Sequence, residues 1–293
     1  MMKQYILYNP LAGNGNAKEA AEKLADASAS QAVLRPVTEI SDYAAFLSVL
    51  TSEDTLIICG GDGTLNRFVN DTAALEIPCE VLYLAVGSGN DFLRDLGKTP
   101  DETPVCITKY IQNLPEAEVK GKTYRFLNNV GYGIDGYCCE VGDELKAKSV
   151  KAINYTSIAI KGLLFHYKPK NAVITVDGKE YRFKKVWLAP TMKGRFYGGG
   201  MMATPEQDRT SPDGKLSLLV FHGSGRLHTL MVFPSIFKGE HVKHTKMVTV
   251  LAGYDVKVTF DAPAAVQIDG ETITDVSEYR AVSKSSVQVS SDK

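Results

Sequence analysis

One glycine-rich turn constrains the fold of this 293-residue chain more than any other feature. An apolar run at residues 56–58 leads into a turn made of Gly60, Gly61, Asp62, Gly63, Thr64, Leu65 and Asn66. After it, Leu65, Phe68 and Val69 recur at helical spacing. The glycines are therefore expected between a buried strand and a helix, where α/β sheets bind ligands and backbone N–H groups favour phosphate. The alternative is a tight turn in which Asp62 only caps the helix.

Two more polar turns follow apolar runs in the first half of the chain, at residues 9–16 and 87–91. Because the carboxyl ends of parallel strands share one edge of a sheet, the three turns are expected to wrap one nucleotide together. Asp62 would then reach Mg²⁺ or its bound waters. Outside the turn at residues 60–66, the residues expected near the nucleotide are Asn9, Gly13, Thr38, Ser88, Asn90 and Asp91. The sequence G-x-x-x-x-G-K-[ST] does not occur, so the chain is not a P-loop protein.

Strands and helices alternate as far as about residue 115, which is typical of a doubly wound parallel sheet. After Pro169, short β patterns dominate and predict an antiparallel β-sandwich. We expect a loop at residues 131–136 and a helix over about residues 149–165. The predicted fold class is α/β: a nucleotide-binding domain at residues 1–124, then a β-sandwich acceptor domain at 125–293, with a cleft between them. The tail from residue 279 could return to the first domain.

Charge and cysteine content exclude other classes of protein. The net charge of −1 gives no basic field for nucleic acid. The five cysteines include no C-x-x-C pair, which suits a reduced cytoplasmic interior better than a disulfide framework. No run approaches the roughly 20 apolar residues that span a bilayer. We expect a soluble, cytoplasmic protein that touches a membrane only peripherally. The sequence leaves the oligomeric state open, including a homo-oligomer.

The ordered motifs resemble those of the diacylglycerol kinase catalytic-domain family, and most closely its soluble bacterial lipid kinases. The matching stretches are Asn9-Pro10-x-Ala12-Gly13, the turns at 60–66 and 87–92, residues 131–135 and 198–201, Pro212-Asp213-Gly214, and Ile268-Asp269-Gly270-Glu271. They extend over nearly the whole chain in order. Gly-Gly-Asp-Gly-Thr alone also occurs in NAD kinases and, as a variant, in phosphofructokinases.

The resemblance implies an NAD kinase- and diacylglycerol kinase-like fold that binds ATP and Mg²⁺ in the cleft. It places Asp62 and Asp91 at the ATP–Mg²⁺ centre and makes Glu271 the general base. Without the resemblance, a Glu after an Asp-Gly turn would be read as a solvated strand residue. A structural Mg²⁺ is implied at Asp213 with backbone oxygens near Thr210 and Lys215, although a plain Pro-Asp-Gly turn fits the sequence equally well.

Two positions depart from the family pattern: Asn14 stands where a basic residue often occurs, and Arg67 where a Glu often occurs. They put the detailed phosphate contacts in question. On the acceptor side, lysines between residues 146 and 170 alternate with apolar residues. This segment could lie on an anionic membrane, but a core-packed helix with a solvated lysine face is favoured.

These observations predict an ATP-dependent lipid kinase that phosphorylates a hydroxyl group of diacylglycerol or a related lipid. Two alternatives stay open. One is a kinase of a soluble alcohol such as NAD. The other is a nucleotide-binding regulator without catalytic activity, which the departures at Asn14 and Arg67 leave possible.

Overall fold

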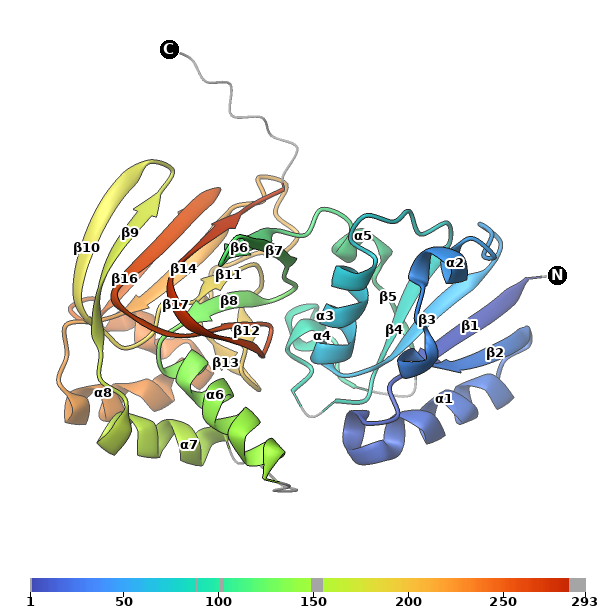
Figure 1. The fold of residues 1–293 in the computed structure, drawn as a ribbon, viewed down its shortest axis with the longest axis horizontal. Helices are drawn as coiled ribbons and strands as arrows, with labels where there is room; N and C mark the ends of the chain where they lie inside the picture. Colours follow the sequence, from blue (N-terminus) through green and yellow to red (C-terminus); the bar gives the residue numbers. More distant parts are fainter. Residues whose placement is uncertain (1, 88, 101–102, 149–154, 285–293) are drawn as a thin grey trace, which may run out of the picture. The chain divides into compact units, whose positions relative to one another are not determined.

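The computed structural model divides the chain into two compact units, Met1–Gln112 and Asn113–Lys293 (Figure 1). It describes residues 2–87, 89–100, 103–148 and 155–284. The hairpin of β6 (Glu116–Val119) and β7 (Lys122–Arg125) lies in the second unit, because β6 pairs with β17 (Glu271–Val282). The boundary predicted at residue 124, between a nucleotide-binding domain and an acceptor domain, concerns function and stays a prediction.

The first unit is built on a five-stranded sheet with the order β2-β1-β3-β4-β5. The strands are β1 (Lys3–Tyr8), β2 (Gln31–Pro36), β3 (Thr55–Gly60), β4 (Glu80–Ala85) and β5 (Val105–Cys106). Strands β1 to β4 are parallel, and the short β5 runs antiparallel to β4. The predicted α/β fold of this half is thus confirmed. Strands β1 and β3 read as apolar runs because both faces of a parallel sheet are covered.

Helices pack on both faces of this sheet. They are α1 (Asn16–Asp26), α2 (Tyr43–Leu47), α3 (Asp62–Asp71), α4 (Asp91–Asp95) and α5 (Thr108–Ile111). Successive residues of β1 point to opposite faces. Ile6 packs with Ala17 and Ala21 of α1, whereas the ring of Tyr5 meets Phe46 of α2 edge to face. A helix was expected after the strand and its glycines, and α3 indeed begins within the glycine-rich turn, at Asp62, two residues after β3 ends.

The second unit is one antiparallel sheet of ten strands, which closes into the predicted sandwich-like fold. Its order is β15-β14-β11-β8-β16-β17-β6-β7, with β9 beside β16 and β10 beside β9. The strands not yet given are β8 (Asn129–Tyr132), β9 (Lys170–Val176), β10 (Lys179–Val186), β11 (Thr191–Met192), β14 (Leu216–Phe221), β15 (Val248–Gly253) and β16 (Asp255–Ile268). The short strands β12 (Phe196–Tyr197) and β13 (Met201–Met202) pair separately.

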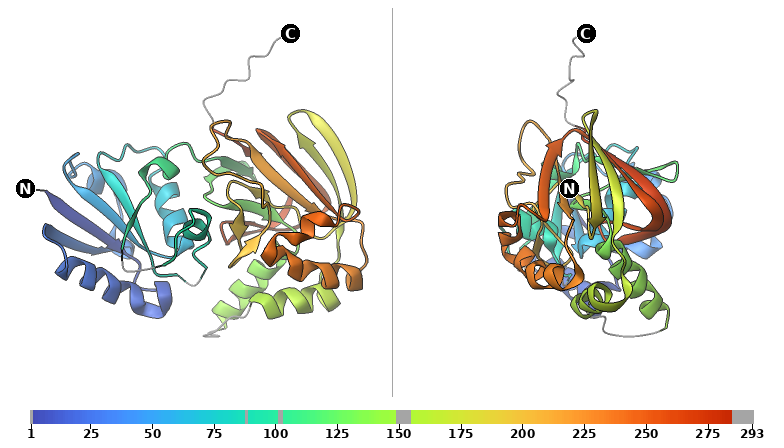
Figure 2. Two further views of the ribbon diagram at one scale, coloured as in Figure 1. Left: turned by 180° about the vertical axis from the view of Figure 1, so that it is seen from behind. Right: turned by 90° about the vertical axis from the view of Figure 1, so that its left-hand side faces the viewer.

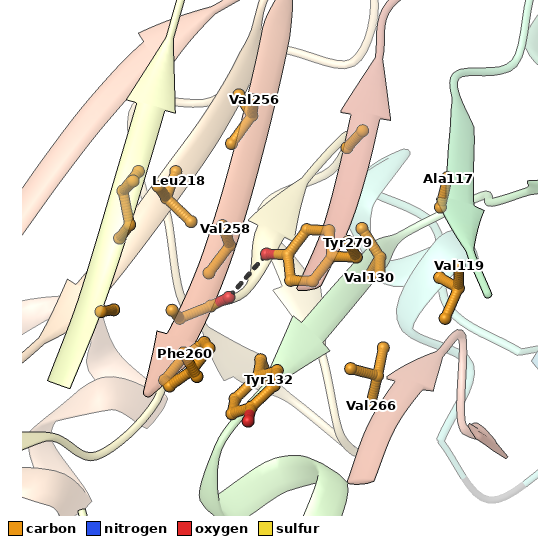
Figure 3. Packing of buried hydrophobic residues seen from close by; sticks show 14 of the residues in the cluster. Ala117, Val119, Val130, Tyr132, Leu218, Val256, Val258, Phe260, Val266 and Tyr279 are labelled. Carbon is orange, nitrogen blue, oxygen red and sulfur yellow. Dashed lines mark hydrogen bonds between the residues drawn. The ribbon is translucent and has the colours of Figure 1, made fainter. Parts of the chain in front are cut away.

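Strand β16 changes partner along its length, which lets one sheet enclose a core. Residues 256–260 pair with β9, and residues 266–268 pair with β8. Its pairing with β17 shifts register between these two parts. Bulges bend a strand at such shifts. Figure 3 shows the side chains that fill the core, among them Tyr279, whose hydroxyl donates to the carbonyl oxygen of Ala189 at 2.8 Å.

Three helices lie at one end of the second unit. They are α6 (Ile134–Ala147), α7 (Tyr155–Lys161), which continues into a π-helical turn (Gly162–His166), and α8 (Arg226–Val232). In the views of Figures 1 and 2, α7 and α8 lie side by side. No helix of the described part of the chain is both long enough and apolar enough to cross a membrane.

Two of these helices correct the sequence-based expectations. The loop predicted at residues 131–136 is wrong, because strand β8 ends at Tyr132 and α6 begins at Ile134. Helix α8 was not predicted. The helix expected over residues 149–165 is confirmed from Tyr155 onward, and residues 149–154 lie outside the described residues. At the other end of the chain, β17 pairs in the second sheet as far as Val282, and residues 285–293 also lie outside the described part.

Candidate active site

The three polar turns of the first unit meet at the carboxyl edge of its sheet. Strands β1, β3 and β4 are neighbours, and hydrogen bonds continue past their last ladder pairs. The N–H of Asn9 donates to the carbonyl oxygen of Cys59 at 3.1 Å, and the N–H of Val86 donates to that of Gly60 at 2.9 Å. The shared edge expected from the sequence is therefore present.

Glycines let the three turns approach each other more closely than side chains would allow. A Cβ on Gly87 would lie only 2.7 Å from the Cα of Gly61. Gly13 has φ +59, and a Cβ there would collide with the carbonyl oxygen of Val86. The glycines are thus needed for the packing of the turns, in addition to the access that they give to a bound anion.

The carboxylate of Asp62 connects the second turn to the third. It accepts the N–H of Asp91 at 2.9 Å and the N–H of Phe92 at 3.2 Å, the first backbone donors of α4. Asp62 therefore caps a helix, but α4 and not the helix that it begins. A carboxylate has about four lone-pair sites, so Asp62 can face a hydrated cation while it holds the two turns together.

Helix α3, ten residues long, begins without a side-chain cap, because Gly61 occupies the N-cap position. Backbone N–H groups at such a helix start favour an anion, and the helix dipole adds to the attraction. Gly63, in the first turn of the helix, has no atom within 4 Å of a Cβ added there, within the described part of the chain. The turn can therefore admit a phosphate group.

Three polar side chains of the predicted site form hydrogen bonds within the protein. The side-chain amide of Asn9 donates to the hydroxyl of Thr64 at 2.9 Å, and its oxygen accepts the N–H of Leu11, just after Pro10. This bond joins the first turn to α3. Thr64 and Asn66 are buried. These side chains shape the turns more than they offer themselves to a ligand.

The remaining predicted residues of this unit differ in their exposure to solvent. Thr38 is exposed in a short turn after β2, at the same edge of the sheet. Asp91 is buried, with its carboxylate 3.8 Å from the guanidinium of Arg94. Arg67 lies on the exposed face of α3. Ser88 lies outside the described residues.

Glu271 lies in the second unit, exposed, as the first residue of β17. The turn before it is held by Asp269, whose carboxylate accepts three backbone N–H groups. They belong to Leu127 at 2.5 Å, Asn128 at 2.8 Å and Asn129 at 2.9 Å. The Asp-Gly pair could be read as a turn from the sequence, but the partners of Asp269 lie 140 to 142 residues away and could not.

A buried acid supports the same turn from the other side and was missed by sequence reasoning. The side-chain oxygen of Gln267 accepts the N–H of Gly270 at 2.9 Å, and its amide donates to Asp135 at 3.3 Å. Asp135 is buried, and loss of solvation raises the pKa of its carboxyl to about 6. The only signal in the sequence was its place in the 131–135 motif.

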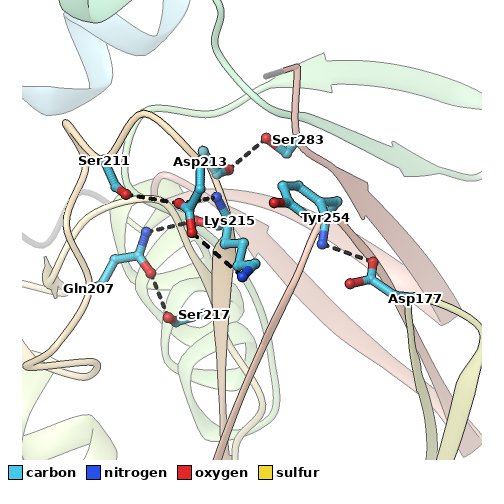
Figure 4. Close-up of polar contacts among 9 residues, drawn as sticks. Asp177, Gln207, Ser211, Asp213, Lys215, Ser217, Tyr254 and Ser283 are labelled. Carbon is cyan, nitrogen blue, oxygen red and sulfur yellow. Dashed lines mark hydrogen bonds and ion pairs between the residues drawn. The ribbon is translucent and has the colours of Figure 1, made fainter. Parts of the chain in front are cut away.

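The predicted metal ligand Asp213 lies in a tight turn of the second unit (Figure 4). Its carboxylate accepts the hydroxyl of Ser211 at 2.8 Å and the N–H of Lys215 at 3.2 Å. The Lys215 ammonium lies 3.6 Å away, and the Lys215 carbonyl accepts from Gln207. Thr210 is bonded to Asp208. Among the described residues, no three His, Cys, Asp or Glu side chains gather in a way that could hold a metal ion.

The chain matches two family models in sequence order. Residues 3–118 match the diacylglycerol kinase catalytic domain, and residues 128–290 match the YegS C-terminal NAD kinase beta sandwich-like domain. Over 265 residues it is 25% identical to a protein named diacylglycerol kinase from Mycobacterium tuberculosis, covering 85% of this chain and 83% of that one. A diacylglycerol kinase from Bacillus subtilis is 24% identical over 282 residues, 92% of this chain and 90% of that one.

The fold also resembles that of a solved structure. A crystal structure titled as a diacylglycerol kinase from Bacillus anthracis strain Sterne aligns with a TM-score of 0.64 at 24% sequence identity. The alignment covers 96% of this chain and 94% of that chain. This likeness supports the fold over almost the full length.

The close approach of the turns predicts the effect of one added methyl group. In Gly87→Ala the new Cβ would lie 2.7 Å from the Gly61 Cα, so the two turns must separate. We expect the free energy of unfolding to fall by about 1–3 kcal/mol in urea titrations followed by circular dichroism. The control is Gly225→Ala, where the structure describes no atom within 4 Å of the added carbon. Equal stability of the two variants would contradict the packing described here.

The buried carboxyl of Asp135 predicts a dependence of stability on pH. Its pKa is about 6 in the folded chain and about 4 when unfolded, so the folded state holds the proton more tightly. Stability is therefore lost as the pH rises from about 4 to 6, by about 3 kcal/mol in all. Asp135→Asn should match the wild type at pH 4 and exceed its free energy of unfolding at pH 8.

The matched control for this measurement is Asp275→Asn. Asp275 is exposed, with 80% of its side chain accessible, so the substitution should change stability by less than about 0.5 kcal/mol at any pH. Parallel stability curves for wild type and Asp135→Asn between pH 4 and 8 would show that burial does not perturb this carboxyl.

Proposed function

Since the chain belongs to the diacylglycerol kinase catalytic-domain family, among its bacterial lipid kinases, we propose that it transfers the γ-phosphoryl group of ATP to a hydroxyl group of diacylglycerol or a related lipid. One observation carries the proposal in this chain. Three glycine-rich turns meet at one edge of the first sheet, and the start of α3 lies among them without a side-chain cap. That arrangement suits the phosphate chain of a nucleotide.

The first unit is proposed to hold the phosphoryl donor. The backbone at Gly61 and Gly63 would contact the phosphate chain, and the turn containing Pro10 and Gly13 would contact the terminal phosphates. Asp62 and Asp91 would hold Mg²⁺ or its water shell. When bound, Mg²⁺ would neutralise charge on the phosphate oxygens. The anionic carboxylate of Asp62, fixed by two N–H groups, supports this assignment.

Thr38 and Ser88 are proposed as further contacts to the nucleotide. Thr38 is exposed at the same edge of the sheet. Asn90, in a left-handed conformation at φ +50, donates to the Gly87 carbonyl at 2.6 Å and so shapes the turn that carries Ser88.

Glu271 is proposed as the general base that takes the proton of the lipid hydroxyl. Phosphorylation of an alcohol requires such a group, because the attacking oxygen loses its proton as the new bond forms. Its exposed position at the start of β17 leaves it accessible to a substrate. The three N–H groups bonded to Asp269 fix the turn, and a fixed turn orients the carboxylate.

Two further expectations remain proposals. A second Mg²⁺ would bind Asp213 and the backbone oxygens of Thr210 and Lys215, provided that the Lys215 ammonium, 3.6 Å from the carboxylate, turns away. A cytoplasmic location is supported by the cysteines, since the five are present as free thiols.

The Glu271→Gln variant tests the proposal. Glutamine keeps the shape but cannot accept the proton, so transfer from radiolabelled ATP to diacylglycerol in mixed micelles should fall by about 10²- to 10⁴-fold. ATP affinity should not change, because Glu271 is not proposed to touch the nucleotide. The matched control is Glu278→Gln, an exposed residue of the same strand that pairs with Lys257 at 3.1 Å. It should keep full activity.

Other outcomes separate the alternatives. Full activity of Glu271→Gln would reject this residue as the base. Phosphorylation of NAD without any lipid product would favour a kinase of a soluble alcohol. ATP binding with no transfer to diacylglycerol, monoacylglycerol or a long-chain base would favour a regulator.

A further inference from the structure

Large apolar side chains are exposed on two neighbouring elements of the second unit. Phe165 of the π-helical turn is 71% exposed, and Leu227 and Met231 of α8 are 72% and 74% exposed. Leu227 and Met231 are four residues apart, so they lie on one face of α8. Single exposed apolar residues are ordinary, but a group of them on adjoining elements marks an interaction site.

The two elements contact each other directly. The guanidinium of Arg226, at the start of α8, donates to the carbonyl oxygen of Leu163 in the π-helical turn at 2.8 Å. It also lies over the ring of Trp187, 5.8 Å from its centre. Figures 1 and 2 show α7 and α8 side by side at this end of the unit. The exposed side chains therefore belong to two elements that are bonded to each other.

The same elements are anchored in the core by other residues. Leu163, Tyr167 and Val232 are buried in one apolar cluster with Trp187. Ile160 of α7, in contrast, is 43% exposed. The exposure of Phe165, Leu227 and Met231 thus belongs to well-packed elements.

Charge on these elements has one sign. Residues 155–170 and 222–239 contain no Asp or Glu, although the whole chain has 34 of them against 33 Lys and Arg. The exposed lysines there are Lys161, Lys168 and Lys238. The neighbouring α6 carries acids, of which Asp143 is paired with Lys146 at 2.8 Å. A surface that combines apolar and basic side chains complements a bilayer with anionic headgroups.

We propose that Phe165, Leu227 and Met231, flanked by Lys161, Lys168 and Lys238, form a docking face for membranes that contain anionic lipids. We call this set the basic apolar face. Its apolar side chains would enter the acyl boundary, while the lysines reach the headgroups. The inference rests on the proposed lipid kinase function for its biological sense, because a diacylglycerol substrate resides in a bilayer. A second copy of the chain is a poorer partner, since two such cationic faces would repel each other.

Vesicle binding tests the inference without catalysis. Full-length wild type should sediment with vesicles of phosphatidylcholine and phosphatidylglycerol, and much less with phosphatidylcholine alone. In the triple variant Phe165→Ser, Leu227→Ser and Met231→Ser, the partition coefficient should fall at least about tenfold. The matched control is Val49→Ser with Val250→Ser, two apolar residues that are 63% and 43% exposed outside this face. Circular dichroism confirms that each variant is folded.

Three results would overturn the inference. They are equal binding of wild type and triple variant, equal binding of wild type to both vesicle types, and a wild-type dimer in vesicle-free solution that the triple variant abolishes. A short-chain diacylglycerol dispersed in water separates this inference from the proposed function. If the wild type phosphorylates it but does not bind vesicles, docking is wrong and the kinase function stands. If the wild type binds vesicles but phosphorylates no lipid, the docking inference stands and the proposed kinase function is wrong.

Discussion

The carboxylate of Asp62 makes the contact on which the site of the first unit depends. By accepting the N–H groups of Asp91 and Phe92, it ties the glycine-rich turn after β3 to the turn after β4. Gly61 and Gly87 then meet backbone against backbone, with no room for a side chain between them. The same residue begins α3 and carries the charge proposed to attract Mg²⁺. Structure and proposed chemistry therefore share one side chain.

The second unit uses the same physical device. Asp269 accepts three backbone N–H groups and so fixes the turn that presents Glu271. Gln267 and the buried Asp135 brace that turn from within. Each unit thus shows its proposed functional residues on a turn held by a carboxylate bonded to backbone N–H groups. Such bonds are strong because the acceptor is charged.

The sequence predicted the parts of the structure that depend on local pattern. The turns at Asn9, Gly60 and Gly87 follow apolar strands, so their shared edge could be inferred from parallel pairing alone. Helix α6 could not be inferred from the sequence, because Gly136 weakens the helical propensity near the start of the helix. The structure explains that glycine, since a Cβ there would collide with the carbonyl oxygen of Ala265 in β16. The role of Asp135 depends on Gln267, 132 residues away, and no local pattern reveals such a contact.

The central claim is that the three turns of the first unit hold one phosphate chain. Backbone amide hydrogen exchange, measured by mass spectrometry with and without ATP and Mg²⁺, tests it most directly. The account predicts slower exchange on nucleotide addition in residues 11–16, 60–66 and 89–95 together, and no change in residues 226–232 of α8. Unchanged exchange in all three turns at a saturating concentration of ATP would contradict it.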